Sequence, residues 1–436
     1  MIRFPLLQAA LLGSLLGFTL GAAAQTDGPL FIVGVCSHEL HKGDVRKQPS
    51  ALISAAGITS VRTDAHWAYV ERERNRLVIE PSWPRYLADT RQHGLDTLFI
   101  LGYGNRFHGD GEKPRSEPVR ASFNRYVAHL AERLKGQVAH YEVWNEWDVE
   151  DPKSPAFTQD YSRLIADAAG IIRQHDPDAR VLAGAVTTLG IESGFAQRLV
   201  ENGVLQSVDG LSLHPYVHCR GWRRNTPEAW IAWLAEVDQQ LTLTAGRPVP
   251  LYLTEMAWPA HEGACGISET LQAAYLARSY FLARTLPNIK GMWWYDFRND
   301  GTDRREREHN FGLLRHDYSA KPAYAVLQAI SEIVSQYELR GQERRANDDV
   351  VLLRFAKGTE ELIVAWSGGR PRTHAIETRA GHAGNVQLLD TAQPQRGRFT
   401  SDIRWNCPSA GRTCTARIEL NEFPKVISTR PVTAAR

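Results

Sequence analysis

The stretch Tyr141-Glu142-Val143-Trp144-Asn145-Glu146-Trp147 begins as a short apolar run and ends with an amide and an acid side by side. Such a run predicts a buried strand, because short apolar segments that end in polar residues are typical of strands covered on both faces. A second run, Val249-Pro250-Leu251-Tyr252-Leu253-Thr254-Glu255, also ends with an acid. The sequence therefore places two carboxylic acids, Glu146 and Glu255, at the ends of two predicted strands.

Runs of this kind recur eight times and alternate with segments at helical spacing. The predicted strands are 31–35, 58–62, 96–101, 140–144, 180–184, 208–213, 250–253 and 289–294. The predicted helices include 122–134, 157–175, 227–241, 268–286 and a last one at 322–334. Eight strand-helix units predict an α/β fold, a closed (β/α)8 TIM barrel over residues 25–335. The rival is a doubly wound open sheet, but Val35-Cys36-Ser37-His38 is not the glycine-rich turn that usually follows the first strand of one.

The pattern changes after residue 335. Short apolar runs at 350–355, 361–366, 386–389 and 415–420 are separated by turn residues, which predicts a small all-β sandwich over residues 336–436. We expect this C-terminal β-sandwich to pack on the barrel and cover apolar surface. The alternative is a carbohydrate-binding module, although Trp366 and Trp405 are too far apart in sequence to form an obvious aromatic row.

The first residues have the order of a secretory signal peptide. Arg3 precedes a mostly apolar run from Phe4 to Leu20, and Ala22-Ala23-Ala24 offers small residues for cleavage. We therefore predict a signal peptide over residues 1–24 and a periplasmic or secreted protein. An uncleaved anchor is the alternative, but the run is short for a bilayer span of about 20 residues. No other stretch is apolar enough to predict a membrane span.

Export makes disulfide bonds possible, and the chain has five cysteines. Cys407 and Cys414 are close in sequence, and Cys219 and Cys265 follow two different predicted strands. Pairing them in this way leaves Cys36 free, although an odd count leaves other pairings open. Zinc sites need CxxC or comparable ligand spacing, which the sequence lacks, and we predict neither a metal nor a cofactor.

Charge and composition narrow the class of partner. The formal net charge of +2 gives no field strong enough to indicate a nucleic acid or an anionic membrane as partner. Twelve tryptophans are many for 436 residues, and large amphipathic rings favour sites where flat surfaces stack. We still expect most of them in the core; Trp230 and Trp233, three apart on a predicted helix, are examples.

In a parallel barrel the active site lies at the C-terminal ends of the strands. Aromatic, amide and acidic groups dominate at these ends. They are His38, Arg62, Asp64, His66, Trp67, Tyr103, Asn105, Asn145, Glu146, His214, Tyr216, Glu255, Trp258, Trp293, Trp294 and Asp296. This mixture suits a sugar, and two acids are the minimum for acid/base hydrolysis of a glycosidic bond.

Several motifs resemble those of a known group of enzymes. Glu-Val-Trp-Asn-Glu at 142–146, His-Pro-Tyr at 214–216 and Leu-Thr-Glu at 253–255 look like the signatures of retaining glycoside hydrolases of clan A. Arg-Thr-Asp-Ala-His-Trp at 62–67, Phe-Gly-Leu-Leu at 311–314 and Lys-Pro-Ala-Tyr at 321–324 resemble family 39 and its bacterial exopolysaccharide-associated endoglycosidases. The resemblance covers residues 30–335 and implies a barrel that cleaves a polysaccharide.

The resemblance implies a role for each matching residue. Glu146 matches the general acid/base and Glu255 the nucleophile. Asn145 matches the amide that binds the sugar 2-hydroxyl, while His214, Tyr216 and Arg62 match residues that hold the nucleophile and line the subsite. Trp147 departs from the family, which usually has proline there, and this puts the local turn in doubt.

Physical chemistry sets conditions on the two acids. Retention of the anomeric configuration requires carboxyl groups about 5–5.5 Å apart. Glu255 must stay ionised, which Arg62 and the Tyr216 hydroxyl would favour, and the pKa of Glu146 should lie above that of Glu255. Glu142 has the same strand parity as Glu146, and we assign it a structural role as a buried acid.

The remaining substrate-binding candidates are His66, Trp67, Trp258 and Trp294. Trp293 and Trp294 point to opposite faces of a strand, so at most one of them faces the sugar, and we favour Trp294. A polysaccharide or oligosaccharide is the expected partner, and a monomer is the expected state.

Two other functions compete with hydrolysis. A catalytically weak carbohydrate-binding protein that assists polysaccharide assembly would keep the barrel without turnover, but such a relative usually loses one of the two acids. A metal-dependent barrel hydrolase or deacetylase needs a His-x-His or equivalent ligand set near the first strand, and His38 and His41 have the wrong spacing for it.

Overall fold

The computed structural model describes residues 30–221, 225–344, 349–379, 387–390, 401–408 and 413–429. The predicted signal peptide at 1–24 and residue 386 of one predicted strand lie outside this range. No helix in the described segments is long and apolar enough to cross a membrane.

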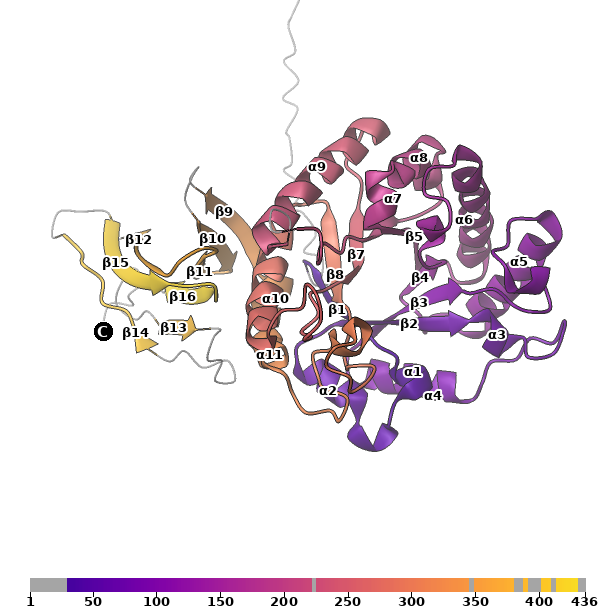
Figure 1. The fold of residues 1–436 in the computed structure, drawn as a ribbon, viewed down its shortest axis with the longest axis horizontal. Coiled ribbons are helices and arrows are strands. Elements are labelled where there is room, and N and C mark those ends of the chain that lie inside the picture. The colour runs from indigo at the N-terminus through magenta and orange to yellow at the C-terminus, as the bar shows by residue number, and fades with distance from the viewer. Residues whose placement is uncertain are drawn as a thin grey trace, which may run out of the picture.

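Eight parallel strands close into a barrel in the order of the sequence (Figure 1). They are β1 (Ile32–Cys36), β2 (Ser60–His66), β3 (Asp96–Gly102), β4 (His140–Val143), β5 (Arg180–Thr187), β6 (Gly210–His214), β7 (Leu251–Met256) and β8 (Ile289–Trp294). Closure comes from β1, which pairs with β2 on one side and with β8 on the other. The predicted TIM barrel is confirmed.

Helices connect the strands and cover the barrel. They are α1 (Glu39–Lys42), α2 (Pro49–Ala55), α3 (Trp67–Val70), α4 (Ser82–Gln92), α5 (Glu117–Arg133), α6 (Pro155–His175), α7 (Thr188–Glu192), α8 (Phe195–Glu201), α9 (Pro227–Ala245), α10 (Glu269–Ala283) and α11 (Pro322–Gln336). Ser154, Thr226 and Ser268 cap α6, α9 and α10 by accepting a hydrogen bond from a backbone N–H of the first turn. These caps fix where the connecting loops end.

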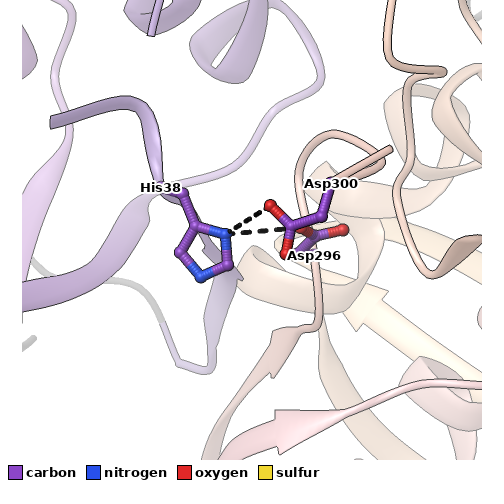
Figure 2. A group of neighbouring side chains, drawn as sticks. All are labelled: His38, Asp296 and Asp300. Atoms are coloured by element: carbon purple, nitrogen blue, oxygen red, sulfur yellow. Dashed lines mark hydrogen bonds and ion pairs between the residues drawn. The ribbon is translucent and has the colours of Figure 1, made fainter. Parts of the chain in front are cut away.

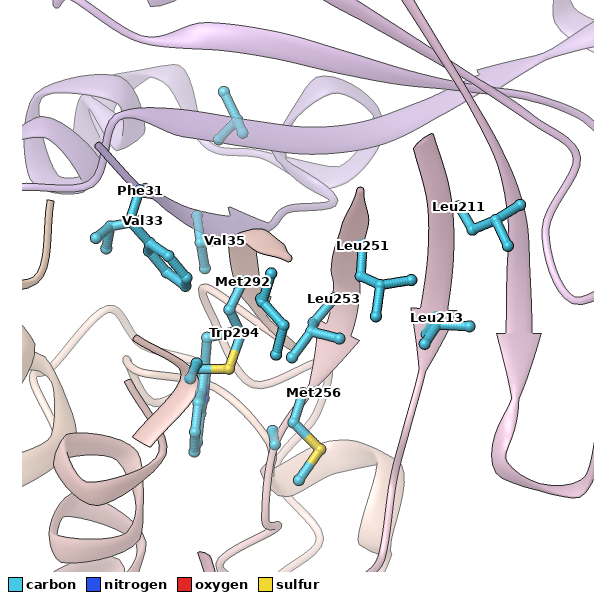
Figure 3. Close-up of a cluster of buried hydrophobic side chains, with 14 of the residues drawn as sticks. Phe31, Val33, Val35, Leu211, Leu213, Leu251, Leu253, Met256, Met292 and Trp294 are labelled. Carbon is cyan, nitrogen blue, oxygen red and sulfur yellow. The ribbon is translucent and has the colours of Figure 1, made fainter. Parts of the chain in front are cut away.

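Strand alternation separates two layers of side chains. The outward residues of β1, β6, β7 and β8 meet the helices in one apolar cluster (Figure 3), which includes Val33, Leu253, Met292 and Trp294. The inward residues form a second cluster at the barrel floor: Cys36, Leu98, Ile100, Leu182, Tyr252 and Trp293. Gly34 lies opposite the indole of Trp293, where an added Cβ would come within 2.3 Å of the ring, so the floor requires glycine there.

The C-terminal part forms two antiparallel sheets. A six-stranded sheet has the order β14-β13-β16-β11-β10-β9, and β12 pairs with β15. The strands are β9 (Glu338–Arg344), β10 (Val350–Lys357), β11 (Glu360–Ser367), β12 (Arg372–Arg379), β13 (Gln387–Asp390), β14 (Ser401–Asp402), β15 (Thr413–Leu420) and β16 (Lys425–Thr429). Side chains from both sheets, such as Leu352, Ile363, Ile376 and Ile418, share one apolar core. The predicted all-β sandwich is confirmed as a fold class, while its boundaries stay a prediction.

The other face of the six-stranded sheet packs on the barrel helices, beside α10 and α11 (Figure 1). The ring of Phe355 lies 5.7 Å from that of Phe281 in α10. The indole N–H of Trp366 donates to Oε1 of Glu228 in α9 at 2.7 Å, and Arg278 of α10 pairs with the same carboxylate. One apolar core therefore continues from the barrel helices into the sheet.

Two disulfide bonds join the cysteine pairs that the sequence favours. Cys219 is bonded to Cys265, and Cys407 to Cys414. Cys36 is free and buried. The first bond ties the loop after β6 to the loop after β7, next to the mouth of the barrel.

Candidate active site

A pocket of about 410 Å³ opens at the C-terminal ends of the strands. Its lining comes from residues in the last part of the strands or in the loops that follow them, and most of these residues are polar or aromatic. They are Cys36, Ser37, His38, Arg62, Thr63, Asp64, Ile100, Tyr103, Asn145, Glu146, Tyr216, His218, Glu255, Tyr295, Arg307, Glu308 and Phe311. The predicted residues Arg62, Asn145, Glu146, Tyr216 and Glu255 are among them.

Glu146 and Glu255 face each other across this pocket. Carboxylate oxygens of the two residues and a ring nitrogen of His214 all lie within 4.8 Å of one another. The side chain of Glu146 is 31% exposed and that of Glu255 is 12% exposed. The spacing matches the short carboxyl separation that retaining glycosidases use, about 5–5.5 Å.

A register shift in β7 explains why Glu255 points inward. Tyr252 faces the barrel interior and Leu253 the helices, so simple alternation would send Glu255 outward. The pairing of β7 with β8 shifts between Leu253 and Met256, which brings both Thr254 and Glu255 to the interior. Such irregularities are frequent beside active sites, where they redirect a side chain.

Arg62 connects the layer below the pocket to the two strand ends. Its Nε donates to Oε2 of Glu142 at 2.7 Å, its Nη1 to Oε1 of Glu255 at 2.6 Å, and its Nη2 to Oδ1 of Asn145 at 2.8 Å. Arg62 is 2% exposed and Glu142 is fully buried. Glu142 is thus a buried acid that holds the guanidinium, in agreement with the structural role assigned to it.

Glu255 is surrounded by donors. Tyr216 donates its hydroxyl to Oε2 at 2.9 Å, and Nδ1 of His214 lies 3.7 Å from the same oxygen. Burial alone would raise the pKa of Glu255, but His214, Arg62 and the Tyr216 hydrogen bond outweigh it and hold the pKa below its ordinary value. Glu255 is therefore ionised at neutral pH.

His214 lies between the two acids at the end of β6. Its Nδ1 is 2.9 Å from Oε1 of Glu146, and its Nε2 is 3.2 Å from Oγ1 of Thr254, which in turn donates to Glu142. Burial lowers the pKa of His214, but Glu255 and the hydrogen bond with Glu146 raise it above the ordinary value overall. His214 is fully buried and acts on the acids from behind the pocket wall.

The backbone around Glu146 is held in an unusual conformation. Glu146 has φ 50°, in the left-handed region, which costs a residue other than glycine about 1–3 kcal/mol. Trp147 follows it and is buried, with its ring stacked 4.9 Å from that of Tyr161. Asp148, also buried, accepts hydrogen bonds from the hydroxyl and the N–H of Thr187. The turn is thus anchored by packing and hydrogen bonds at Trp147, the position where the sequence resemblance led us to expect proline.

A second group of acidic and histidine side chains adjoins the pocket (Figure 2). Nδ1 of His38 lies 2.9 Å from Oδ1 of Asp300 and 4.0 Å from Oδ2 of Asp296. Burial lowers the pKa of His38, but its hydrogen bond with Asp300 raises it overall, while burial raises the pKa of Asp296 well above its ordinary value. Lys42 also pairs with Asp300 at 3.6 Å. His38 therefore presents to the pocket a ring that is oriented by its contact with Asp300.

Both acidic groups have the residue types and spacing of a metal site. Cationic side chains already pair with carboxylates of both groups, however: Arg62 with Glu255 in the first and Lys42 with Asp300 in the second. A cation would have to displace or repel these groups. The donor set therefore fits proton chemistry better than metal binding.

Three predicted sugar contacts do not reach the pocket. Trp67, Trp258 and Trp294 are fully buried. Trp67 donates to Glu71, Trp258 donates to Asn225, and Trp294 donates to the carbonyl of Phe311, a residue that does line the pocket. The prediction that Trp294 contacts the sugar is wrong, because Trp294 faces the helices. Trp293 faces the barrel interior but fills the floor below the pocket.

His66 does not line the pocket, but its ring lies 5.3 Å from that of Tyr103, which does. The wall itself contains Tyr103, which the sequence places at a strand end, and also Tyr295 and Phe311, which the sequence did not single out as site residues. Tyr295 follows Trp293 by two residues, so strand parity could have identified it. Phe311 stands in a long loop after β8 and carries no comparable signal.

No protein-family model and no curated protein matches the sequence. Solved structures do match. A family 39 glycoside hydrolase from the gut symbiont Bacteroides cellulosilyticus superposes with a TM-score of 0.75 at 24% identity, over 92% of this chain and 81% of that chain. A monomeric beta-xylosidase from Caulobacter crescentus gives 0.61 at 18% identity, over 93% and 98% of the two chains.

A family 30 subfamily 8 xylanase from Clostridium acetobutylicum gives a TM-score of 0.62 at 12% identity, over 93% of this chain and 96% of that chain. In all three cases the match extends through the barrel into the C-terminal sheets, because more than nine tenths of this chain is covered. The chain therefore has the fold of the glycoside hydrolases of families 39 and 30, a TIM barrel followed by antiparallel β-sheets.

Proposed function

We propose that the protein is a retaining glycoside hydrolase, with Glu255 as nucleophile and Glu146 as general acid/base. The observation that carries this proposal is the pair of carboxylates, one from the end of β4 and one from β7, with oxygens within 4.8 Å across a pocket. The likeness to glycoside hydrolases supports it, because the two acids stand at strand ends of the shared barrel.

In the first step an ionised Glu255 oxygen attacks the anomeric carbon of the bound sugar. The bond to the glycosidic oxygen breaks, its electron pair stays on that oxygen, and protonated Glu146 donates its proton there. Arg62 and Tyr216 each hold one Glu255 oxygen, at 2.6 and 2.9 Å, and so orient the carboxylate for attack. The product is a covalent glycosyl-enzyme and a free alcohol.

In the second step Glu146, now a carboxylate, removes a proton from water. The water oxygen attacks the anomeric carbon, and the bond to Glu255 breaks with return of its carboxylate. The 31% exposure of the Glu146 side chain allows water to reach it. Two inversions at one carbon give net retention of configuration.

The pocket walls supply the contacts that a sugar needs. Asn145 accepts a hydrogen bond from Arg62, and we assign it the binding of the 2-hydroxyl; His38 would offer a further polar contact. Tyr103, Tyr295 and Phe311 provide apolar faces. We propose no metal and no cofactor for the reaction.

The substrate class and the location complete the proposal. We propose that the substrate is a polysaccharide, linked through the family 39 resemblance to bacterial exopolysaccharide, and that the protein is a periplasmic or secreted monomer after removal of residues 1–24. The two disulfide bonds are compatible with an oxidising compartment.

Product analysis tests the proposal directly. The protein is incubated with a panel of bacterial and plant polysaccharides, products are identified by mass spectrometry, and the anomer formed first is read by proton NMR. We expect cleavage with retention, and at least a 10⁴-fold loss for Glu255→Gln, which keeps the shape and removes the nucleophile. Equal cleavage by that variant would show that the nucleophile is wrongly assigned.

A second variant separates the acid from the nucleophile. Glu146→Gln should lose little of the first step on a dinitrophenyl glycoside, because that leaving group needs no proton, and should accumulate the glycosyl-enzyme. Glycan binding without turnover by the parent would favour the carbohydrate-binding alternative. Loss of parent activity with a chelator would favour the metal-dependent one.

A further inference from the structure

A row of rings leads from the pocket to the rim of the barrel mouth. Tyr103 lines the pocket, and its ring centroid lies 5.3 Å from that of His66. The ring of His66 lies 4.8 Å from that of Tyr69. Exposure increases outward, since the side chain of His66 is 29% exposed and Tyr69 is 40% exposed.

Tyr69 stands in α3, directly after β2, at the same end of the barrel as the pocket. It lines two depressions. One, of about 430 Å³, also contains Arg106 and Phe107 from the loop after β3. The other, of about 260 Å³, contains Val78, which is itself 49% exposed. Two exposed apolar side chains therefore adjoin on this rim.

Guanidinium groups accompany these rings. Arg106 lies 4.9 Å from the ring of Phe107, and no carboxylate within the described segments pairs with it. Arg72 lies 5.7 Å from the ring of Tyr69 and also pairs with Glu80. Apolar ring surface combined with N–H donors is the combination that binds a sugar, which has hydrophobic faces and a hydroxyl rim.

Core packing does not explain the exposure of Tyr69. Trp67, two residues earlier in the same short helix, is fully buried and hydrogen-bonded, as a core aromatic is. Tyr69 keeps 40% of its surface exposed although it contacts His66 and His41. Tyr69 is thus a partly exposed ring that two further rings, His66 and Tyr103, connect to the pocket. A glycan bound in the pocket could extend to this position.

We propose that Tyr69, with His66 and Arg106, forms a distal subsite that binds an additional sugar ring of a glycan whose scissile bond lies in the pocket. This inference rests on the proposed function and makes it more specific: the substrate is a polysaccharide that extends over the β2 and β3 loops. Short glycosides fill the pocket alone and do not reach Tyr69.

Kinetics on long and short substrates test the subsite. Tyr69→Ala should raise KM for a polysaccharide about three- to tenfold and leave kinetics on a nitrophenyl monoglycoside unchanged. Leu189→Ala is the matched control, because Leu189 is 49% exposed in α7, after β5 at the same end of the barrel. Equal KM values for Tyr69→Ala and the parent on every polysaccharide cleaved would overturn the proposal.

A binding measurement separates this inference from the reaction itself. Glu255→Gln and the double variant with Tyr69→Ala are run in native gels that contain arabinoxylan, galactomannan or alginate, which cover neutral and acidic glycans. We expect at least one glycan to retard Glu255→Gln and to retard the double variant less. No retardation, or equal retardation of both variants, contradicts the subsite. If the parent hydrolyses none of these glycans and the double variant is still retarded less than Glu255→Gln, then Tyr69 binds glycan and the proposed reaction is wrong.

Discussion

Arg62 lies 2.6 Å from Glu255, and this contact joins the proposed nucleophile to a side chain that is itself fixed from below by Glu142. A guanidinium can donate along several directions at once, whereas an ammonium is a point charge. Arg62→Lys keeps the charge but cannot reach Glu255, Glu142 and Asn145 together. We expect kcat/KM to fall about 10²-fold, in the range for loss of one oriented donor in an active site.

Steady-state kinetics on a cleaved substrate check this expectation. Arg125→Lys, a change on the exposed side of α5, serves as the control for arginine replacement as such. Wild-type kcat/KM in Arg62→Lys would show that Glu255 is oriented by its other partners.

The acid limb of the pH profile should depend on Tyr216. The pKa of Glu255 is depressed in the fold, and hydrogen bonds to the ionised form contribute to this. Activity that needs the carboxylate is lost as the pH falls through that pKa. Removal of the donor in Tyr216→Phe raises the pKa of Glu255, so the acid limb of kcat/KM should move to higher pH. An unchanged limb, or one moved to lower pH, would mean that another group controls it.

The barrel and its two acids were predictable for a definite reason. All eight strands are buried on both faces, so they are read as apolar runs, and a parallel barrel collects their C-terminal ends at one place. This reasoning placed Glu146 and Glu255 at strand ends, and the motif resemblance supplied their proposed roles. The C-terminal sheets were predicted because the apolar runs after residue 335 are short and are separated by turn residues instead of helical segments.

The tryptophans show where such reasoning ends. Alternation states that Trp293 and Trp294 face opposite sides, but only closure of the barrel decides which side is the interior. Even the inward residue, Trp293, fills the barrel floor, and the pocket is lined by Tyr295, two residues later. The inward direction of Glu255 depends on a register shift in β7, which no local pattern announces.

Asp148 is a residue that the sequence analysis missed. It is buried, burial raises its pKa, and it accepts hydrogen bonds from Thr187 that fasten the turn carrying Glu146. Asp148→Ala leaves the N–H of Thr187 without this acceptor, which should cost about 1–3 kcal/mol of unfolding free energy. Because Glu146 loses its anchored turn, kcat should fall as well, more than KM rises.

Thermal denaturation and kinetics measured together check this role. Asp151→Ala, in the exposed part of the same loop, is the control. A loss of stability with full kcat would show that Asp148 supports the fold without positioning Glu146.

Phe355 should be a main point of attachment between the C-terminal sheets and the barrel. Its ring is 1% exposed and packs against Phe281 of α10. Phe355→Ala removes a large buried ring and leaves a cavity, which typically costs about 3–5 kcal/mol. We expect a lower midpoint of thermal unfolding, with kinetics on small glycosides retained below that midpoint, because the ring is on the far side of α10 from the pocket.

Ile376→Ala, a buried apolar truncation in the core between the two C-terminal sheets, controls for damage to the sandwich itself. If Phe355→Ala unfolds with the parent's midpoint, the contact with α10 contributes little and the sheets are held by Trp366 and its neighbours.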